Sequence, residues 1–299
     1  YLLTSLAEEG HCFAPEAELI LQAQSMLEIP VEVLSAALVE ELAAGRLVRE
    51  QDRIYLRTLH EAERRTAACL LRLRDTPRRF APLAAPAAVA WAERKMGIAL
   101  APAQRDALLT ALEAKVAIIT GGPGVGKTTI IRALVEIFGA RRLQVRLAAP
   151  TGRAAKRMSE ATGHEAQTIH RLLKYLPAAR AFEFTADNPL DGDVFIIDES
   201  SMIDIRLMEQ FAQALPPAAC LILVGVFKKV VIADRCAVVV DQVYGAPEHY
   251  GALSIALATY LFAVQIYCDF SGYTDIALGA ARVMGFNLMV NFRTPYLSK

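Results

Sequence analysis

The chain has 299 residues, with 32 basic and 32 acidic side chains. This length allows two domains and a sizeable core, whereas the zero formal charge excludes a bulk electrostatic attraction to nucleic acid or membrane. Five widely spaced cysteines form no CxxC pair, which argues against a structural zinc site or a disulfide framework. The first ten residues lack the basic and apolar regions of a signal peptide, so we expect residues 1–225 to be cytoplasmic. Because the chain does not begin with Met, we interpret it as a fragment of a longer protein.

Charge and aromatic content divide the chain near residue 225. Residues 226–299 hold 11 of the 64 charged side chains but 11 of the 22 aromatic ones. Soluble proteins usually carry about 25% charged residues, a share that residues 1–225 approach and residues 226–299 do not. We therefore expect the two parts to be adapted to different solvents.

Residues 1–75 are expected to form a small helical domain. The stretch VEVLSAALVEELAAGRLV, residues 31–48, has apolar residues at helical spacing and a Gly-Arg stop at its end. The stretch RIYL, residues 53–56, alternates as a short strand does. Two helices and a short hairpin suggest a winged-helix-like unit. DNA contact and simple packing are equally open for it, since a fold does not name a function.

A linker is predicted at residues 76–99. It follows the charged stretch EAERRTAACLLRLRD, residues 61–75, which we interpret as a linker helix. It contains the stretch APLAAPAAVA, residues 81–90, whose Pro and Ala content indicates a connector.

Between residues 100 and 225, short apolar runs alternate with helical stretches. The predicted strands are KVAIIT (115–120), QVRLAAP (144–150), DVFIIDE (193–199) and CLILVG (220–225). Their hydrophobicity is continuous, which is typical of strands that are covered on both faces. The pattern therefore predicts an α/β fold with a parallel sheet and helices on both faces.

A phosphate-binding loop is predicted between the first of these strands and the helix that follows. The stretch GGPGVGKT, residues 121–128, matches the pattern G-x-x-x-x-G-K-[ST] in that context. Glycines let backbone N–H groups face phosphate oxygens, and the helix N-terminus adds a positive dipole. Lys127 is expected at the β- and γ-phosphates and the Thr128 hydroxyl on Mg²⁺. The residues predicted to bind ATP here are Gly121, Gly122, Pro123, Gly124, Val125, Gly126, Lys127, Thr128 and Thr129.

Two carboxylates are predicted to complete this site. In the stretch VFIIDESSM, residues 194–202, Asp198 leaves an apolar strand where it can hold Mg²⁺ directly or through water. Glu199 is placed to orient and deprotonate an attacking water. The alternative is an acidic pair at a helix start, where acids are favoured in any case.

The order of these motifs resembles the first motor domain of RecD-type superfamily 1 DNA helicases. The resemblance covers residues 1–225 and rests on GGPGVGKTT, AAPTGRAAKRM (148–158), QTIHRLL (167–173) and IIDESSMID (196–204). It implies a RecA-like P-loop NTPase fold, the cofactors ATP and Mg²⁺, and single-stranded or tailed duplex DNA as partner. It also implies that Gln104 reads the adenine base.

Contacts with DNA are implied for two segments. Pro150, Thr151, Gly152 and Arg153 match the motif that touches the single-strand backbone, and His170 and Arg171 lie in the TIHRLL motif. By residue type alone, Lys156, Arg157 and Arg171 form either a phosphate-contacting patch or a solvated helix face.

The resemblance to a helicase ends at Gly225. In the family this strand continues into an acid and then a glutamine that senses the γ-phosphate, whereas here Val226-Phe227-Lys228-Lys229 follows. The second motor domain and its arginines are also missing, and such an arginine contributes about 10³–10⁵ in rate. We therefore expect ATP·Mg²⁺ binding with weak hydrolysis and no unwinding by this chain.

Residues 226–299 have a different character. No charged residue occurs between Glu248 and Asp269, and the stretch Tyr250 to Cys268 is long enough for a membrane span. A buried helix of a soluble domain is the alternative. The run QIYCDFSGYTDIALG resembles membrane-bound O-acyltransferases of the alginate-acetylating kind. The histidine on which that family relies has no counterpart, so we expect no acyltransferase activity, but membrane association or aggregation.

The two resemblances meet inside a predicted sheet, so we interpret Gly225 as a join between two unrelated sequences. An artefactual or engineered fusion is favoured over a natural protein with two functions, because natural fusions usually fall in linkers. Two rival hypotheses remain beside the motor segment. One is a fragment of a membrane O-acyltransferase, and the other is a non-catalytic DNA-binding module that acts through residues 1–75.

Overall fold

The computed structural model describes residues 1–8, 10–121 and 125–225. The N-terminal unit, residues 1–56, has a three-stranded antiparallel sheet in the order β1-β3-β2. Its elements are α1 (Leu2–Glu8), β1 (Phe13–Pro15), α2 (Glu16–Leu27), α3 (Val31–Ala43), β2 (Leu47–Glu50) and β3 (Arg53–Leu56). A small core of Leu3, Ala14, Leu19, Leu38 and Ile54 holds them together. The elements of this unit follow in the order helix, strand, two helices and hairpin.

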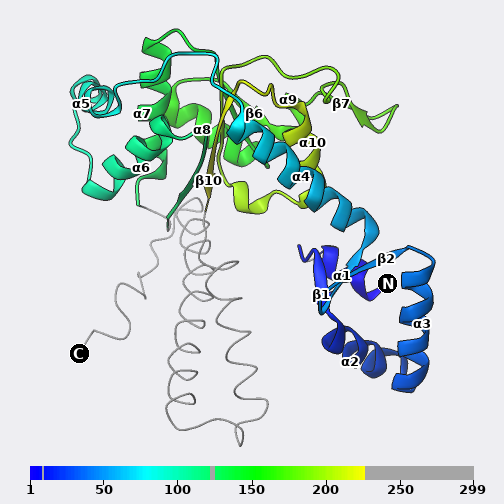
Figure 1. The fold of residues 1–299 in the computed structure, drawn as a ribbon. Helices are drawn as coiled ribbons and strands as arrows, with labels where there is room; N and C mark the ends of the chain where they lie inside the picture. The colour runs from blue at the N-terminus through cyan, green and yellow to red at the C-terminus, as the bar shows by residue number, and fades with distance from the viewer. Residues whose placement is uncertain (9, 122–124, 226–299) are drawn as a thin grey trace, which may run out of the picture.

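Helix α4 (Arg57–Asp75) connects the N-terminal unit to the rest of the protein (Figure 1). It packs along α10 (Ile205–Ala214). Arg65 Nε lies 2.6 Å from Glu209 Oε1, and this glutamate is one of the few buried charged residues in the described part of the chain. Helix α4 is therefore part of the packing of the second unit as well as a linker.

Part of the expected connector is helical. Helix α5 (Ala85–Met96) buries Val89 and Ala92 in the main core and packs on α6 (Pro102–Glu113) and α7 (Lys127–Ala140). Proline is tolerated in the first turn of a helix, and alanine is the best helix former. A Pro/Ala-rich stretch is therefore compatible with a helix start as well as with a connector.

The second unit contains a five-stranded parallel sheet in the order β4-β10-β9-β5-β6, which confirms the predicted α/β fold. The strands are β4 (Val116–Thr120), β5 (Val145–Ala149), β6 (Ala166–Thr168), β9 (Val194–Ile197) and β10 (Cys220–Gly225). Helix α8 (Gly152–Thr162), helix α9 (Ile169–Leu172), the two-stranded hairpin β7 (Tyr175–Leu176) and β8 (Ala181–Phe182), and the short 3₁₀ helix η1 (Ser200–Met202) complete the unit.

Helices cover both faces of this sheet. In the central strand β9, Val194 and Ile196 pack with α5 to α8, whereas Phe195 and Ile197 pack with α4, α9 and α10. Figure 1 shows these two groups of helices on opposite sides of the sheet. Successive side chains of a strand point to opposite faces. A strand that is buried on both sides must therefore be apolar at every position, as the continuous run VFII is.

Lys115 joins three segments of the chain just before β4. Its ammonium donates hydrogen bonds to the backbone carbonyls of Thr76 at 2.7 Å and Pro217 at 2.9 Å. The side chain is buried, and burial lowers the pKa of this lysine. The contact fixes the end of α4 and the loop before β10 to the same end of the sheet.

None of the helices in the part of the chain that the structure describes combines the length and the apolar character that a membrane span requires. The predicted span Tyr250 to Cys268, and every other prediction on residues 226–299, lies outside the described residues.

Candidate nucleotide site

The carboxyl ends of three neighbouring strands bring the predicted nucleotide-binding elements together. Strand β10 pairs with β4 up to Gly225 and Thr120. On its other side β10 pairs with β9, where Leu223 is opposite Ile197. The loop after β4 and the Asp198-Glu199 pair after β9 therefore leave the same edge of the sheet, on either side of β10. Ligands of open α/β sheets bind at this edge.

The loop after β4 is described at its two ends, whereas Gly122, Pro123 and Gly124 lie outside the described residues. Gly126 precedes α7 with a φ of +84°, in the left-handed region that favours glycine. Lys127 Nζ donates a hydrogen bond to the carbonyl oxygen of Gly121 at 2.7 Å, across the loop. Thr128 is exposed and Thr129 half-buried in the first turn of α7.

Gln104 touches this loop from α6. Its Nε2 donates to the carbonyl oxygen of Val125 at 2.9 Å, and its Oε1 accepts from the backbone N–H of Ala101 at 3.0 Å. A Cβ on Gly126 would lie 2.2 Å from Gln104 Nε2. The glutamine side chain therefore packs directly against the backbone of the phosphate-binding loop.

Asp198 and Glu199 begin where β9 ends. The Asp198 N–H donates to the carbonyl of Ala148, and Asp198 Oδ1 accepts from the N–H of Glu199 at 2.9 Å. Burial raises the pKa of Asp198, while the Glu199 N–H and the charges of Lys127 and Arg157 act in the opposite direction. Lys127 and Asp198 are thus within electrostatic reach of each other, although they are 71 positions apart in the sequence.

Glu199 has an unusual backbone and a cationic neighbour. Its φ of +51° is in the left-handed region, which is uncommon for residues other than glycine and often marks a functional site. Its Oε1 lies 3.5 Å from Arg157 Nη2, on α8. Sequence reasoning missed this pair, because only the fold brings α8 next to the end of β9.

The donor set fits Mg²⁺. A half-buried carboxylate and a hydroxyl are hard oxygen ligands, and Mg²⁺ takes most of its ligands from water and phosphate rather than from a protein cage. The described residues contain no cluster of three or more His, Cys, Asp or Glu side chains that could hold a metal. Burial also leaves the Asp198 carboxylate short of compensating charge, which a cation would supply.

The residues predicted to contact DNA follow the next two strands at the same edge. Pro150 to Arg153 follow β5, and His170 and Arg171 lie in α9, directly after β6. Thr151 caps α8, since its Oγ1 accepts from the N–H of Ala154 at 3.2 Å. Arg153, His170 and Arg171 are exposed. The sheet order thus places the predicted DNA residues beside the carboxylate pair, on the side away from the phosphate-binding loop.

An aromatic cluster adjoins His170. The His170 ring centroid is 6.2 Å from that of Tyr175, on β7, and 5.8 Å from that of Phe182, on β8. Tyr175 is 43% exposed. Such rings can stack on bases of single-stranded nucleic acid. Sequence reasoning missed Tyr175 and Phe182, because the hairpin that joins them has no pattern of its own.

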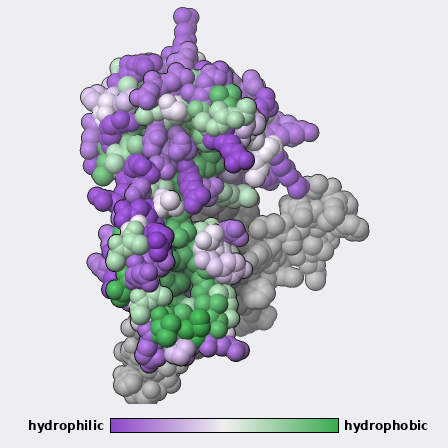
Figure 2. Space-filling view, turned by 90° about the vertical axis from the view of Figure 1, so that its right-hand side faces the viewer, coloured by the Kyte–Doolittle hydropathy of each residue, from purple (hydrophilic) through white to green (hydrophobic). Residues whose placement is uncertain are grey.

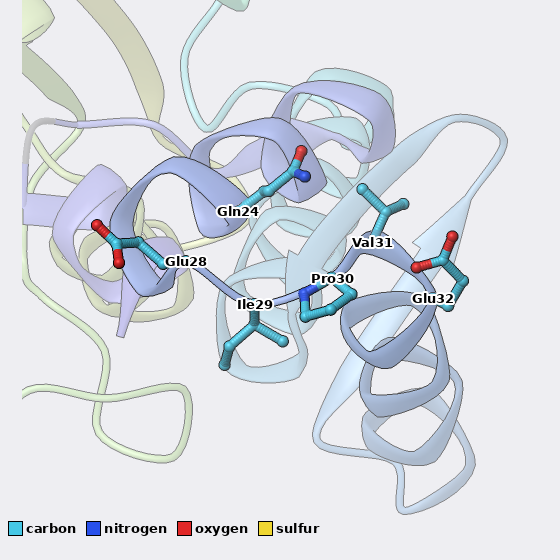
Figure 3. Close-up of a pocket in the computed structure, with 6 residues that line it drawn as sticks. All are labelled: Gln24, Glu28, Ile29, Pro30, Val31 and Glu32. Carbon is cyan, nitrogen blue, oxygen red and sulfur yellow. The ribbon is translucent and has the colours of Figure 1, made fainter.

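The N-terminal unit exposes apolar and acidic side chains. Residues 1–56 carry ten acidic and three basic side chains. Figure 2 views the molecule from the side of this unit, and the lower half of the view shows hydrophobic surface. The exposed large hydrophobic residues of α2, α3 and the loop between them are Leu21, Met26, Leu27, Val31, Val33 and Val39. A shallow pocket at the turn between the two helices is lined by Gln24, Glu28, Ile29, Pro30, Val31 and Glu32 (Figure 3).

Comparison with known proteins gives the family context of this site. Residues 104–230 match the family model described as an AAA domain. The ATP-dependent RecD2 DNA helicase of Deinococcus radiodurans is 32% identical over 232 residues, which cover 73% of this chain and 32% of the relative. The RecBCD enzyme subunit RecD of Mycobacterium tuberculosis is 38% identical over 179 residues, which cover 52% of this chain and 31% of the relative. Part of the chain is therefore similar in sequence to RecD helicases, and the chain spans about a third of the length of these relatives.

A second similarity concerns a smaller part of the chain. The probable alginate O-acetylase AlgI of Pseudomonas putida is 46% identical over 77 residues, which cover 25% of this chain and 15% of the relative. This match is too short to describe the whole chain.

Proposed function

We propose that residues 100–225 bind ATP·Mg²⁺ as the first motor segment of a RecD-type DNA helicase. The observation that carries this proposal is the convergence of Lys127, Asp198 and Glu199 at the carboxyl edge of three adjacent parallel strands. The similarity to RecD helicases supports DNA as the partner on which the parent motor acts.

Each residue has a separate role in this proposal. The N-terminus of α7 and the ammonium of Lys127 bind the β- and γ-phosphates. Thr128 and Asp198 hold Mg²⁺, which when bound offsets the negative charge of the phosphate oxygens. Glu199 orients the attacking water and accepts its proton. Gln104 reads the adenine from its position beside the loop.

Hydrolysis by this chain is proposed to be weak. Residues 1–225 supply one motor lobe, whereas translocation needs two lobes that close around the nucleotide. Position 226, after β10, is Val where the helicase family has an acid, and the glutamine that senses the γ-phosphate is missing as well. Binding without unwinding is therefore the expected behaviour of the 299-residue chain.

The test is binding of fluorescently labelled ATP to the full chain in the presence of Mg²⁺. Lys127→Ala is expected to abolish saturable binding. Lys95→Ala is the matched control, because Lys95 lies on α5 and pairs with Glu136 at 2.7 Å. Binding that survives Lys127→Ala, or that is absent at millimolar nucleotide in the unmodified chain, contradicts the proposal.

A second candidate concerns residues 226–299. The similarity to an alginate O-acetylase supports the proposal that these residues derive from a membrane O-acyltransferase and are joined to the motor segment at Gly225. One continuous genomic DNA read across the codons around Gly225 tests the join. A read in which the helicase sequence continues past this codon identifies the join as an artefact.

The surface of the N-terminal unit does not favour a DNA-binding module there. In helix-turn-helix folds the second helix enters the major groove, and its neighbourhood is basic. Here the second helix of the pair, α3, carries Glu32, Glu40 and Glu41 and no Lys or Arg. Two of the unit's three arginines are also paired, Arg46 with Glu41 and Arg49 with Glu16.

A further inference from the structure

We propose that Arg157 couples single-stranded DNA to the nucleotide site by exchanging partners between Glu199 and a DNA phosphate. Without DNA, Arg157 holds the carboxylate of Glu199. With DNA bound, it turns to the backbone phosphate and releases Glu199 to act on water. This inference rests on the proposed motor function and assigns a positioning role to a residue outside the motifs that bind nucleotide.

The geometry of the pair supports the first state. Arg157 Nη2 lies 3.5 Å from Glu199 Oε1, and the two side chains are 65% and 25% exposed. The Arg157 charge also reaches Asp198, where it acts to lower the pKa. A guanidinium in this position forms an ion pair with the Glu199 carboxylate. It therefore competes with the attacking water for the same carboxylate.

The position of Arg157 on α8 supports the second state. Arg153, Lys156 and Arg157 follow the spacing i, i+3, i+4, so they share one exposed face of the helix. The buried residues Ala154, Ala155 and Met158 anchor the opposite side in the core. Helix α8 begins directly after Pro150 and Thr151, the segment predicted to touch the DNA backbone. The arginine therefore stands between a carboxylate and the expected path of a phosphate.

The strength of the pair allows the exchange. An exposed ion pair of this kind favours the paired state of the arginine over the unpaired state by only about two- to fivefold. A competing phosphate can overcome a preference of this size. Arginine also binds phosphate oxygens through two parallel N–H bonds, which suits it to the second partner. Because coupling between two binding events is reciprocal, removing the charge of Glu199 must strengthen DNA binding through Arg157.

The experiment is a double-mutant cycle on DNA affinity, in the absence of nucleotide and Mg²⁺. Fluorescein-labelled oligothymidine is titrated with the full chain and with Glu199→Gln, Arg157→Gln and the double variant. Glu199→Gln is expected to bind about two- to fivefold more tightly. Arg157→Gln is expected to bind more weakly, with the slope of log affinity against log salt reduced by about 0.7.

The double variant decides between the proposal and a general charge effect. If Arg157 carries the coupling, Glu199→Gln has no effect in the Arg157→Gln background. Its effect persists in the Lys156→Gln background, because Lys156 pairs with Glu160 instead. If Glu199→Gln raises DNA affinity equally in the unmodified chain, in Arg157→Gln and in Lys156→Gln, the lost negative charge acts non-specifically. This result overturns the proposal.

ATP hydrolysis is the second measurement. Arg157→Gln is expected to raise the DNA-free rate and to remove stimulation by oligothymidine, whereas an arginine with only a structural role leaves the stimulation ratio unchanged. Labelled-ATP binding is measured in parallel. Absence of ATP binding in the unmodified chain contradicts the motor function itself. If the chain binds ATP but the effects of Glu199→Gln and Arg157→Gln on DNA affinity simply add, the coupling is contradicted while the motor function is not. The same holds if the chain binds ATP but has no affinity for oligothymidine.

Discussion

Gln104 Nε2 donates a hydrogen bond to the carbonyl oxygen of Val125, at 2.9 Å, and so connects α6 to the phosphate-binding loop. The family resemblance assigns Gln104 to the adenine base, and the structure adds a contact with the loop. We predict that Gln104→Ala lowers ATP affinity by about two- to tenfold, the range of one net hydrogen bond. The preference for ATP over GTP is expected to fall at the same time.

Titration of both labelled nucleotides checks this prediction. Gln22→Ala is the control, since Gln22 lies on α2 and donates a hydrogen bond to Glu18 of the same helix. Equal loss of affinity for ATP and GTP would assign Gln104 to the loop and not to the base.

Two glycines, one just before α7 and one in its last turn, give opposite predictions for the same substitution. Gly126 has a φ of +84°, and a Cβ there would meet Gln104 Nε2. Gly126→Ala is expected to destabilise the protein by about 1–2 kcal/mol and to abolish nucleotide binding. Gly139 lies in the last turn of the same helix, and a Cβ there would meet no atom within 4 Å. Gly139→Ala is expected to stabilise by about 0.5–1 kcal/mol.

Urea unfolding and labelled-ATP binding of the two variants measure these effects. A Gly126→Ala protein with normal binding would show that the loop tolerates a side chain next to Gln104.

The structure also shows where sequence reasoning succeeds and where it stops. The apolar runs VFII and CLILV predict buried parallel strands, because each strand is covered on both faces and needs apolar residues at every position. The placement of β10 between β4 and β9 has no signal in the sequence, since it depends on how the crossovers wind. The pair Arg157–Glu199 joins residues 42 positions apart, so it follows only from that topology.

The expected connector shows a different limit. Residues 81–90 are rich in Pro and Ala, a composition that is compatible both with an irregular linker and with a helix that has Pro in its first turn, as α5 has. The packing of Val89 and Ala92 on the helices around β4 decides between them. Local composition does not contain that information.

Asp198→Asn is predicted to stabilise the nucleotide-free protein. Burial raises the pKa of Asp198 above the ordinary value of an aspartate, so the folded state disfavours the ionised form. A group with a raised pKa in the folded state loses stability as the pH rises through that pKa, and asparagine removes this loss. We expect the Tm of the variant to exceed that of the unmodified chain at pH 7.

The pH dependence and the response to Mg²⁺ test the cause. The difference in Tm is expected to disappear when the pH falls below the ordinary aspartate pKa. With ATP and Mg²⁺ present, the unmodified chain is expected to gain more stability than the variant, since the variant lacks the carboxylate that holds the cation together with Thr128. A variant that is less stable at every pH would show that Asp198 acts mainly through the hydrogen bond from the Glu199 N–H.

Lys115 gives a prediction about the frame that holds the site. Its ammonium serves the carbonyls of Thr76 and Pro217, which come from the end of α4 and from the loop before β10. Lys115→Met keeps the apolar stem of the side chain but leaves these part-buried acceptors without a donor, at about 1–3 kcal/mol for each group that stays dry. We therefore expect the free energy of unfolding in urea to fall by about 2–4 kcal/mol.

Lys174→Met is the control, because the Lys174–Glu183 pair at 2.8 Å is exposed and contributes less than about 1 kcal/mol. Equal losses in the two variants would mean that water replaces the ammonium of Lys115.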